Sequence, residues 1–203
     1  MTPAEAAARP RVEGDREQEI LDAALEVLGE VGYDRLTMDA VAQRAKASKA
    51  TLYRRWNSKA KLVVESLARM KTTPEVLPDT GDLRTDLMEA FCGLGGLTDH
   101  DTTSTFGAVV TAVSTDPEFA AEFRKQVVGP KSEVSRTVFE RARDRGDLRH
   151  DVDLDLIVPA LSGIVLHRMF VLGEQPDVAL IERAIDQIIL PAVRPQVADP
   201  SHQ

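Results

Sequence analysis

The sequence lacks the features that mark secreted, fibrous and membrane proteins. Its one cysteine, Cys92, excludes an intrachain disulfide framework, and 12 glycines and 11 prolines in 203 residues are too few for a fibrous protein. The longest apolar stretch, residues 157–166, is well short of the ~18 to 20 residues that cross a bilayer. The first 16 residues mix acids with arginines and lack the apolar core of a signal peptide. We therefore expect an intracellular protein that stays in the cytoplasm.

The composition indicates a folded protein, and its charge is divided unevenly along the chain. Hydrophobic residues make up 43% and charged residues 29% of the sequence, which is the ordinary globular range. The net charge of −8 argues against a protein that coats nucleic acid through bulk positive charge. Residues 35–71, however, carry ten basic side chains and two acids, whereas residues 72–203 carry 12 basic side chains and 22 acids. A local +8 and a local −10 indicate two regions with different partners, the first a polyanion.

Apolar periodicity predicts four helices in the first third of the chain. Residues 1–14, rich in alanine, proline and arginine, are predicted to be a disordered tail. An amphipathic helix follows, with Gly32 as its stop. Thr37, Ser48 and Ser58 are N-cap candidates for three more helices, because their side-chain oxygens can accept hydrogen bonds from free backbone N–H groups.

A break that contains proline and glycine, at residues 74–81, divides the chain into two domains. Residues 15–73 are predicted to form the first domain and residues 82–194 the second, with a flexible tail over residues 195–203. Every long segment of the second domain has helical periodicity, and the Gly-Pro pair at residues 129–130 is expected to kink or divide one of them. We therefore predict an all-α fold of about nine helices, in which a three-helix helix-turn-helix domain precedes a helical bundle.

The second to fourth predicted helices have the chemistry of a DNA-binding surface. A short connection between the second and third helices is what a helix-turn-helix requires, and its third helix lies in the major groove. Ala50 would let that helix approach the groove closely, while Ser58 and Lys59 would offer free N–H groups and a cation to a phosphate. The side chains of the third helix that can donate to phosphates and base edges are Lys49, Thr51, Tyr53, Arg54 and Arg55.

An ordered pattern of residues runs through this region. It consists of Thr-Met-Asp-Ala-Val-Ala-Gln-Arg-Ala at 37–45, Ser-Lys-Ala-Thr-Leu-Tyr-Arg-Arg-Trp at 48–56 and Ser-Lys-Ala-Lys-Leu at 58–62, preceded by Gly-Glu-Val-Gly-Tyr-Asp at 29–34. The pattern resembles the DNA-binding signature of the TetR family of transcriptional regulators. The match covers residues 15 to about 72 and is far more specific than a short motif, whereas the resemblance beyond it is weaker.

The resemblance implies a homodimer whose two third helices enter successive major grooves of a pseudo-palindromic operator in double-stranded DNA. By position in the family's motif, Thr37, Tyr53 and Lys59 would contact phosphates, and Leu52 and Trp56 would be structural. The residues that would face the groove are Ser48, Lys49, Ala50, Thr51 and Arg54.

One position departs from the family's pattern. The turn residue that is usually glycine in this family is Lys46 here. Either Lys46 adopts a left-handed conformation, at a cost of roughly 1 kcal/mol, or the turn differs slightly. Its charge would offset that cost by reaching a phosphate, so Lys46 is included among the expected DNA contacts.

The resemblance also implies a ligand pocket inside the C-terminal bundle and a dimer interface made by the last two long helices. His167 and Arg168 lie within an apolar segment where polar groups need partners, and they would face either the pocket or the dimer interface. Cys92 is either a redox sensor or, as is usual on an apolar face, a small hydrophobe. The side chains that would line the pocket, each individually more typical of ordinary core, are Met88, Phe91, Cys92, Phe106, Val110, Phe139, His167 and Met169.

We find no pattern of catalytic or metal-ligating residues in the sequence. An acidic segment at residues 151–155 imitates the start of a calcium loop, but Leu156 replaces its glycine and Ser162 its final glutamate. The four histidines include no pair at metal-ligand spacing, and the glycines at 93–96 lack the spacing of a phosphate loop. We therefore expect no enzyme activity, no cofactor and no metal.

The leading hypothesis is a ligand-responsive transcriptional repressor that binds its operator as a homodimer. A small-molecule effector in the C-terminal bundle would favour a state whose third helices no longer match the operator, so that DNA is released. Two alternatives stay open, a protein-interaction adaptor whose basic face binds a partner other than DNA, and a ligand-binding or enzymatic bundle. Binding to random and selected DNA at varied salt separates the regulator from the adaptor.

Overall fold

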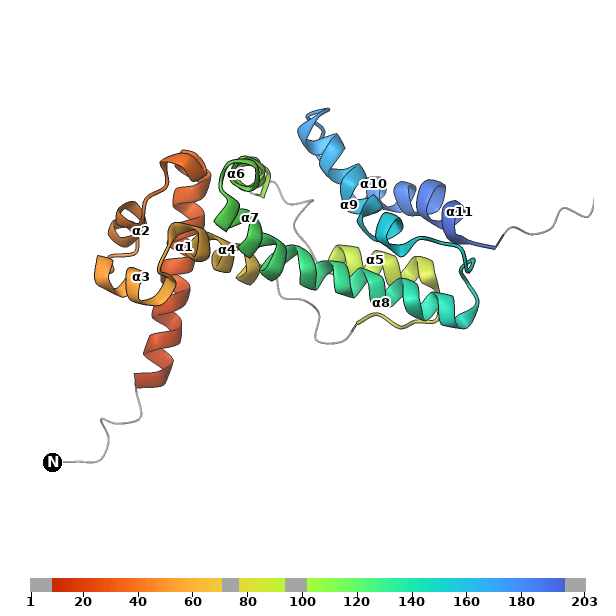
Figure 1. Ribbon diagram of the computed structural model, residues 1–203, viewed down its shortest axis with the longest axis horizontal. Helices are drawn as coiled ribbons and strands as arrows, with labels where there is room; N and C mark the ends of the chain where they lie inside the picture. The colour runs from red at the N-terminus through yellow and green to blue at the C-terminus, as the bar shows by residue number, and fades with distance from the viewer. Residues whose placement is uncertain (1–8, 71–76, 94–101, 196–203) are drawn as a thin grey trace, which may run out of the picture. The chain divides into compact units, whose positions relative to one another are not determined.

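The computed structural model describes residues 9–70, 77–93 and 102–195, and its regular structure is helical throughout (Figure 1). The described residues form nine continuous helices, two of which contain a π-helical turn between α-helical parts. The all-α class predicted from periodicity is confirmed. In the described part of the chain, no helix is long and apolar enough to cross a membrane.

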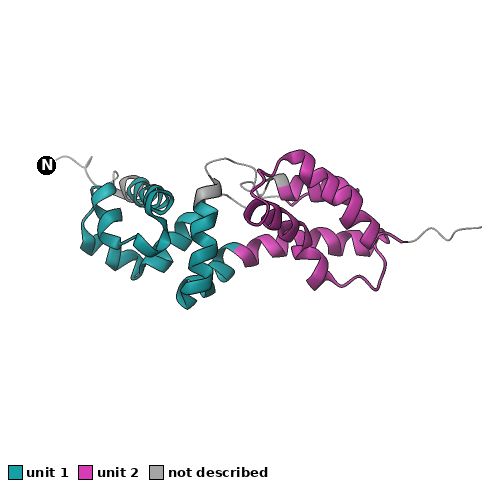
Figure 2. Ribbon diagram, turned by 90° about the horizontal axis from the view of Figure 1, so that it is seen from above, with its two compact units in different colours: residues 1–70, 104–127 teal, residues 71–103, 128–203 magenta. Residues whose placement is uncertain are grey.

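The chain folds as two compact units, whose division differs from the predicted domains (Figure 2). The N-terminal unit contains the described residues up to 70 together with residues 104–127, and the C-terminal unit contains the rest. Residues 104–127 were predicted to belong to the C-terminal domain. They pack instead with the N-terminal helices, because the side chain of Phe119 is fully buried in the core of that unit. Helices that follow the Pro-Gly break therefore contribute to the core of the N-terminal unit.

The N-terminal unit begins with a helix that is longer than predicted. Helix α1 starts at Arg9, inside the segment predicted to be a disordered tail, and it tolerates Pro10 because the first turn of a helix leaves its N–H groups unpaired. At Gly32 the backbone leaves helical geometry, with φ 75° and ψ 166°, so the predicted stop is a kink before a last turn. The helices of this unit are α1 (Arg9–Arg35), α2 (Met38–Arg44), α3 (Lys49–Trp56), α4 (Lys59–Arg69), α6 (Thr102–Thr115) and α7 (Pro117–Phe123).

The three predicted N-caps are confirmed. The side-chain oxygens of Thr37, Ser48 and Ser58 each accept a hydrogen bond from the backbone N–H three residues further on. Such a cap contributes about 1 kcal/mol to helix stability and also specifies where the helix starts. The lengths of the two loops that flank α3 are therefore set by local sequence.

An aromatic contact joins α7 to α1. The rings of Tyr33 and Phe119 meet edge to face with centroids 4.7 Å apart, and Phe123 stacks on Phe119 at 5.8 Å. The Tyr33 hydroxyl donates a hydrogen bond to Asp116 Oδ2 at 2.6 Å, and burial together with this bond raises the pKa of Tyr33. Tyr33 is thus a neutral donor at physiological pH, and it ties the start of α7 to the end of α1.

Each of the two π-helical turns precedes a proline, one where residues 104–127 of the N-terminal unit end and the other within the C-terminal unit. The π-helical turns η1 (Arg124–Val128) and η2 (Ile185–Ile189) each end two residues before a proline, Pro130 or Pro191. A wider turn there relieves the clash between the proline ring and the carbonyl four residues earlier. The kink expected at Gly129-Pro130 is therefore present as a π turn. The α-helices of the C-terminal unit are α5 (Leu83–Gly93), α8 (Gly129–Arg145), α9 (Leu154–Phe170), α10 (Val178–Ala184) and α11 (Leu190–Val193).

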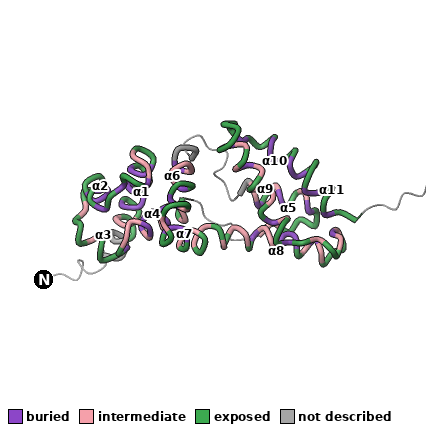
Figure 3. Tube along the Cα trace, turned by 45° about the horizontal axis from the view of Figure 1, so that its top comes forward, coloured by how far each residue is buried: buried purple, intermediate pink, exposed green. Residues whose placement is uncertain are grey.

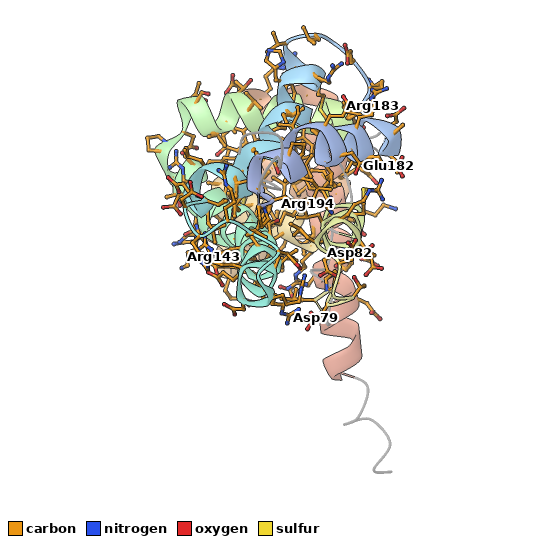
Figure 4. All side chains as sticks on the ribbon, turned by 90° about the vertical axis from the view of Figure 1, so that its right-hand side faces the viewer. Asp79, Asp82, Arg143, Glu182, Arg183 and Arg194 are labelled. Carbon is orange, nitrogen blue, oxygen red and sulfur yellow. The ribbon has the colours of Figure 1, made fainter. Side chains whose placement is uncertain are left out.

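An ion pair joins α5 to η2, and a local cap holds the start of α5. Arg84 pairs with both carboxylate oxygens of Asp186, at 2.6 and 2.9 Å. The carboxylate of Asp82 accepts hydrogen bonds from the backbone N–H and the hydroxyl of Thr85, which hold its pKa below the usual range. Arg194, labelled with Asp82 in Figure 4, lowers that pKa further through its charge.

We predict that Asp116→Asn removes part of the acid sensitivity of the protein. The hydrogen bond from Tyr33 holds the pKa of Asp116 below its ordinary value, and the Phe119 N–H lowers it further. Because the folded-state pKa lies below the unfolded-state value of about 3.9, this stabilisation is complete above that value and is lost as the pH falls through the folded-state pKa. The free energy of unfolding in urea should therefore fall less steeply below about pH 4 for the variant than for the wild type. Glu122→Gln, which removes an acid from the same helix, is the control, and identical profiles for wild type and Asp116→Asn would contradict the prediction.

Candidate nucleic-acid interface

Two buried side chains determine which face of α3 is exposed. Leu52 and Trp56, one helical turn apart, are 0% and 2% exposed, and the Trp56 indole N–H donates to Glu65 Oε2 of α4 at 2.9 Å. The opposite face of α3 must then point outward, because a helix places residues three or four apart on one side. The structural roles expected for Leu52 and Trp56 agree with this burial. The predicted groove residues Ser48, Lys49, Ala50 and Arg54 are exposed, and Thr51 is half-buried.

The turn between α2 and α3 uses the first of the two conformations considered for Lys46. Its φ is 50°, a left-handed conformation that costs a residue with a side chain roughly 1 kcal/mol. The guanidinium of Arg16, from α1, donates to the Lys46 carbonyl at 2.6 Å, and Arg16 also pairs with Glu19. A charge-assisted hydrogen bond thus holds the strained residue from outside the turn. The role of Arg16 was not predicted, because nothing in the local sequence links it to a residue 30 positions away.

Three of the predicted contact residues have side chains without partners in the described part of the chain. Lys46, Tyr53 and Arg54 make no side-chain hydrogen bond or ion pair there, and Tyr53 is 50% exposed. Lys49 pairs with Asp39 of α2, but both side chains are more than half exposed and such pairs are weak. The first turn of α3 and its outer face therefore present donors that can bind an external polyanion.

Arg55 makes contacts within the N-terminal unit that the sequence did not predict. Its guanidinium pairs with Glu17 at 2.6 Å and with Glu65 at 3.1 Å, and it lies 5.4 Å from the centroid of the Trp56 ring. Arg69 contacts the same two glutamates. This network links α1, α3 and α4, so Arg55 braces the unit. The contact with α1 depends on Glu17, which is distant in sequence and was not considered.

The start of α4 is already in contact with other parts of the N-terminal unit. Lys59 donates to the Tyr33 carbonyl at 3.1 Å, and its ammonium lies 4.3 Å from the centroid of the Tyr33 ring. The Ser58 hydroxyl donates to Glu118 Oε1 of α7 at 2.9 Å. Thr37, the other predicted phosphate contact nearby, is exposed. Lys59 is therefore half-buried, and its ammonium, unlike the guanidinium of Arg54, already has a partner among the described residues.

The predicted pocket residues are divided between the two units. Phe91 and Phe139 line a cavity of the C-terminal unit, and Met88 packs beside them at the core. Met169 is buried but does not line this cavity, and His167 is exposed. Arg168 pairs with Glu174. Phe106 and Val110 lie on α6 in the N-terminal unit, where Val110 is 46% exposed, and the side chain of Cys92 lies outside the described residues.

The cavity of the C-terminal unit is small and apolar. Its volume is about 10 Å³, which is the space of a single water molecule. Apart from Ser135 it is lined by apolar side chains of α5, α8, α9 and η2. A drug-sized ligand needs several hundred Å³, so this conformation of the unit is closed.

Helix α9 carries a continuous exposed stripe that is largely apolar. Leu156, Pro159, Gly163, His167 and Phe170 recur at helical spacing, and all five are exposed. Figure 3 draws exposed residues in green along the helices. The side chain of Leu156 is 73% exposed. The exposed residues of α10 and η2 also include large apolar side chains. Contiguous apolar surface of this kind is typical of a contact with another protein surface.

We predict that Lys46→Gly stabilises the protein. Glycine adopts a positive φ without steric cost, so the free energy of unfolding should rise by up to about 1 kcal/mol. Lys46→Ala is the matched control, because it removes the same charge but keeps the Cβ, and it should leave stability unchanged. Urea unfolding measures both variants, and equal effects of glycine and alanine would contradict the conformational explanation.

Comparison with known proteins finds family matches in both units. Residues 20–65 match the family model described as "Bacterial regulatory proteins, tetR family", and residues 77–188 match the one described as "Tetracyclin repressor-like, C-terminal domain". An uncharacterised HTH-type transcriptional regulator of Mycobacterium bovis is 36% identical over 181 residues, which are 88% of each chain.

Two further relatives support the same assignment. The DNA-binding transcriptional repressor TetR of Mycobacteroides abscessus is 34% identical over 181 residues, 89% of this chain and 95% of that one. The crystal structure of a TetR-family transcription regulator superimposes with a TM-score of 0.68 at 28% identity, covering 89% of this chain and 100% of the other. The chain therefore belongs to the TetR family of bacterial transcriptional regulators.

Proposed function

We propose that this DNA-binding transcriptional regulator is a repressor, which binds a pseudo-palindromic operator as a homodimer and leaves it when a small molecule binds the C-terminal unit. The observation that carries the proposal is the outer face of α3, where Tyr53 and Arg54 have no partner within the described residues. A relative of 34% identity is named a repressor, which supports repression over activation. Since DNA is the proposed partner, we place the protein in the cytoplasm and assign it no reaction.

The proposed DNA contacts follow from the exposed donors of the N-terminal unit. Arg54 would read a base edge, since a guanidinium binds guanine through two hydrogen bonds. Lys49, Thr51 and Ser48 would also face the groove, while Ala50 leaves room for close approach. The proposed phosphate contacts are Thr37, Lys46, Tyr53 and Lys59.

The proposed dimer interface is the exposed stripe of α9 together with the adjacent exposed face of α10 and η2. Leu156 and Phe170 offer apolar area, and Gly163 between them allows another helix to come close. No atom lies within 4 Å of a Cβ placed on Gly163, so the single chain leaves that space open. His167 lies on the same stripe, and a dimer would place it at the interface rather than in the pocket.

The proposed effector step requires the closed cavity of the C-terminal unit to open. Phe91 and Phe139 line the cavity, so an effector would have to displace aromatic side chains to enter. An affinity difference of roughly 3 kcal/mol between the two states of the protein would change operator occupancy about a hundredfold. A ligand screen by thermal shift, followed by operator release, tests this step.

We expect Arg54→Ala to weaken operator binding and to relax sequence choice at one base pair of each half-site. Losing one bidentate contact costs about 1–3 kcal/mol, which is roughly a five- to hundredfold loss in affinity. The operator is first selected from random DNA with wild-type protein, and affinities are then measured at several salt concentrations. Arg124→Ala is the control, because it removes the same charge from an exposed position of η1, outside the proposed DNA contacts and the proposed dimer interface.

The same measurements separate regulator from adaptor. Lys46→Ala, a proposed phosphate contact, should reduce the salt slope of binding by about one without changing sequence choice. If wild-type protein enriches no sequence over random DNA at moderate salt, the proposed function is wrong and the adaptor is favoured.

We expect Gly163→Arg to convert the dimer into a folded monomer. The larger side chain has room in the single chain but would occupy the space of the partner helix. Gly14→Arg is the matched control, because Gly14 of α1 is equally open and lies outside the proposed interface. Sedimentation at micromolar concentration reports the mass of each variant, and a Gly163→Arg protein that stays dimeric would exclude this interface.

A further inference from the structure

The first turn of α7 lies against the first turn of α4. The Ser58 hydroxyl, which caps α4, donates to Glu118 Oε1 at 2.9 Å. Two residues earlier, Asp116 accepts a hydrogen bond from the Tyr33 hydroxyl at 2.6 Å. The carbonyl and the ring of Tyr33 in turn hold the ammonium of Lys59. Two acids of α7 and two donors of α4 thus gather around one tyrosine.

The position of Glu118 is set by the core of the N-terminal unit. Phe119, its neighbour in sequence, is 0% exposed and contacts the Tyr33 ring. The Asp116 carboxylate accepts hydrogen bonds from the N–H groups of Glu118 and Phe119, at 3.0 and 3.1 Å, and so caps α7. The backbone of Glu118 is therefore held firmly, whereas its side chain is exposed and can swing away.

The Glu118 carboxylate at the start of α4 accepts a hydrogen bond that a phosphate could also accept. The start of a helix attracts anions through its free N–H groups, and a hydroxyl and an ammonium strengthen that attraction. Carboxylate and phosphate oxygens accept the same charge-assisted hydrogen bonds. The Ser58 hydroxyl has one O–H to donate, so it cannot serve the Glu118 carboxylate and a phosphate at once. The negative charges of the two groups also repel each other.

We propose that Glu118 is a determinant of DNA affinity, because it competes with a DNA phosphate for the Ser58 hydroxyl at the start of α4. Operator binding then requires the Glu118 side chain to leave this position. Since Glu118 is carried by α7, a shift of α7 on α4 changes how strongly the carboxylate competes. The inference rests on the proposed function, because it assumes that the start of α4 meets a phosphate.

The test compares two substitutions that remove the same charge one helical turn apart on α7. Glu118→Gln should bind the selected operator about three- to fivefold more tightly than wild type, the size expected when one exposed charged competitor is lost. Glu122, whose carboxylate accepts a hydrogen bond from Gln126 at 2.7 Å, does not contact α4 through a hydrogen bond among the described residues. Glu122→Gln should change operator affinity by less than about twofold.

A double-mutant cycle tests the competition itself. In a Ser58→Ala protein the contested hydroxyl is absent, so Glu118→Gln should add no more than Glu122→Gln does. Ser58→Ala also removes a helix cap that contributes about 1 kcal/mol, and circular dichroism of every variant establishes that the full chain is folded.

The outcomes distinguish the inference from the proposed function. Equal affinity gains for Glu118→Gln and Glu122→Gln, with operator binding intact, would overturn the inference and leave the proposed function standing. An undiminished effect of Glu118→Gln in the Ser58→Ala protein would overturn it as well. A wild-type protein that selects no operator would overturn the proposed function and the inference together.

Discussion

The burial of Leu52 and Trp56 is the constraint on which the proposed DNA-binding surface depends. These two side chains hold one face of α3 against the core of the N-terminal unit, and the opposite face is exposed to solvent. The N-cap at Ser48 determines where the helix begins, so the same few residues specify both its start and its rotation. Replacing exposed residues of α3 would therefore change the proposed DNA contacts at little cost in folding.

Internal ion pairs reduce the positive charge that the N-terminal unit offers to a partner. Arg44 pairs with two glutamates of α1, and these contacts lower the pKa of Glu30. Arg55 and Arg69 share two further glutamates. The local +8 of residues 35–71 thus overstates the free charge, because acids of α1 that lie outside that window pair with it. What a polyanion meets is the smaller set that has no internal partner.

Predictions made from short-range patterns were confirmed, whereas predictions that needed long-range packing were incomplete. The helix starts at Thr37, Ser48 and Ser58 depend on a side chain and an N–H three residues away, and all three were predicted. The place of residues 104–127 depends on the contact of Phe119 with Tyr33, more than 80 positions earlier. Periodicity identifies an apolar face but not the surface that covers it.

The same distinction explains the two candidate sites. The exposed donors of α3 were predicted almost completely, because a buried pair at helical spacing leaves one possible outer face. The residues predicted to line a pocket are divided between the units, since Phe106 and Val110 are apolar and helical like Phe91 and Phe139 but lie in the other unit.

The sequence by itself determined the helical class, the helix-turn-helix, its caps and its outward-facing donors, since each depends on residues a few positions apart. Only the tertiary structure decided that Arg55 braces the unit, that Arg16 supports the left-handed Lys46 and that Glu118 reaches the start of α4. Those contacts join residues between 30 and 60 positions apart, and they are made by polar groups that no periodicity distinguishes. Hydrophobic patterning identifies the helices, and only their packing determines which of their polar groups form hydrogen bonds and ion pairs with one another.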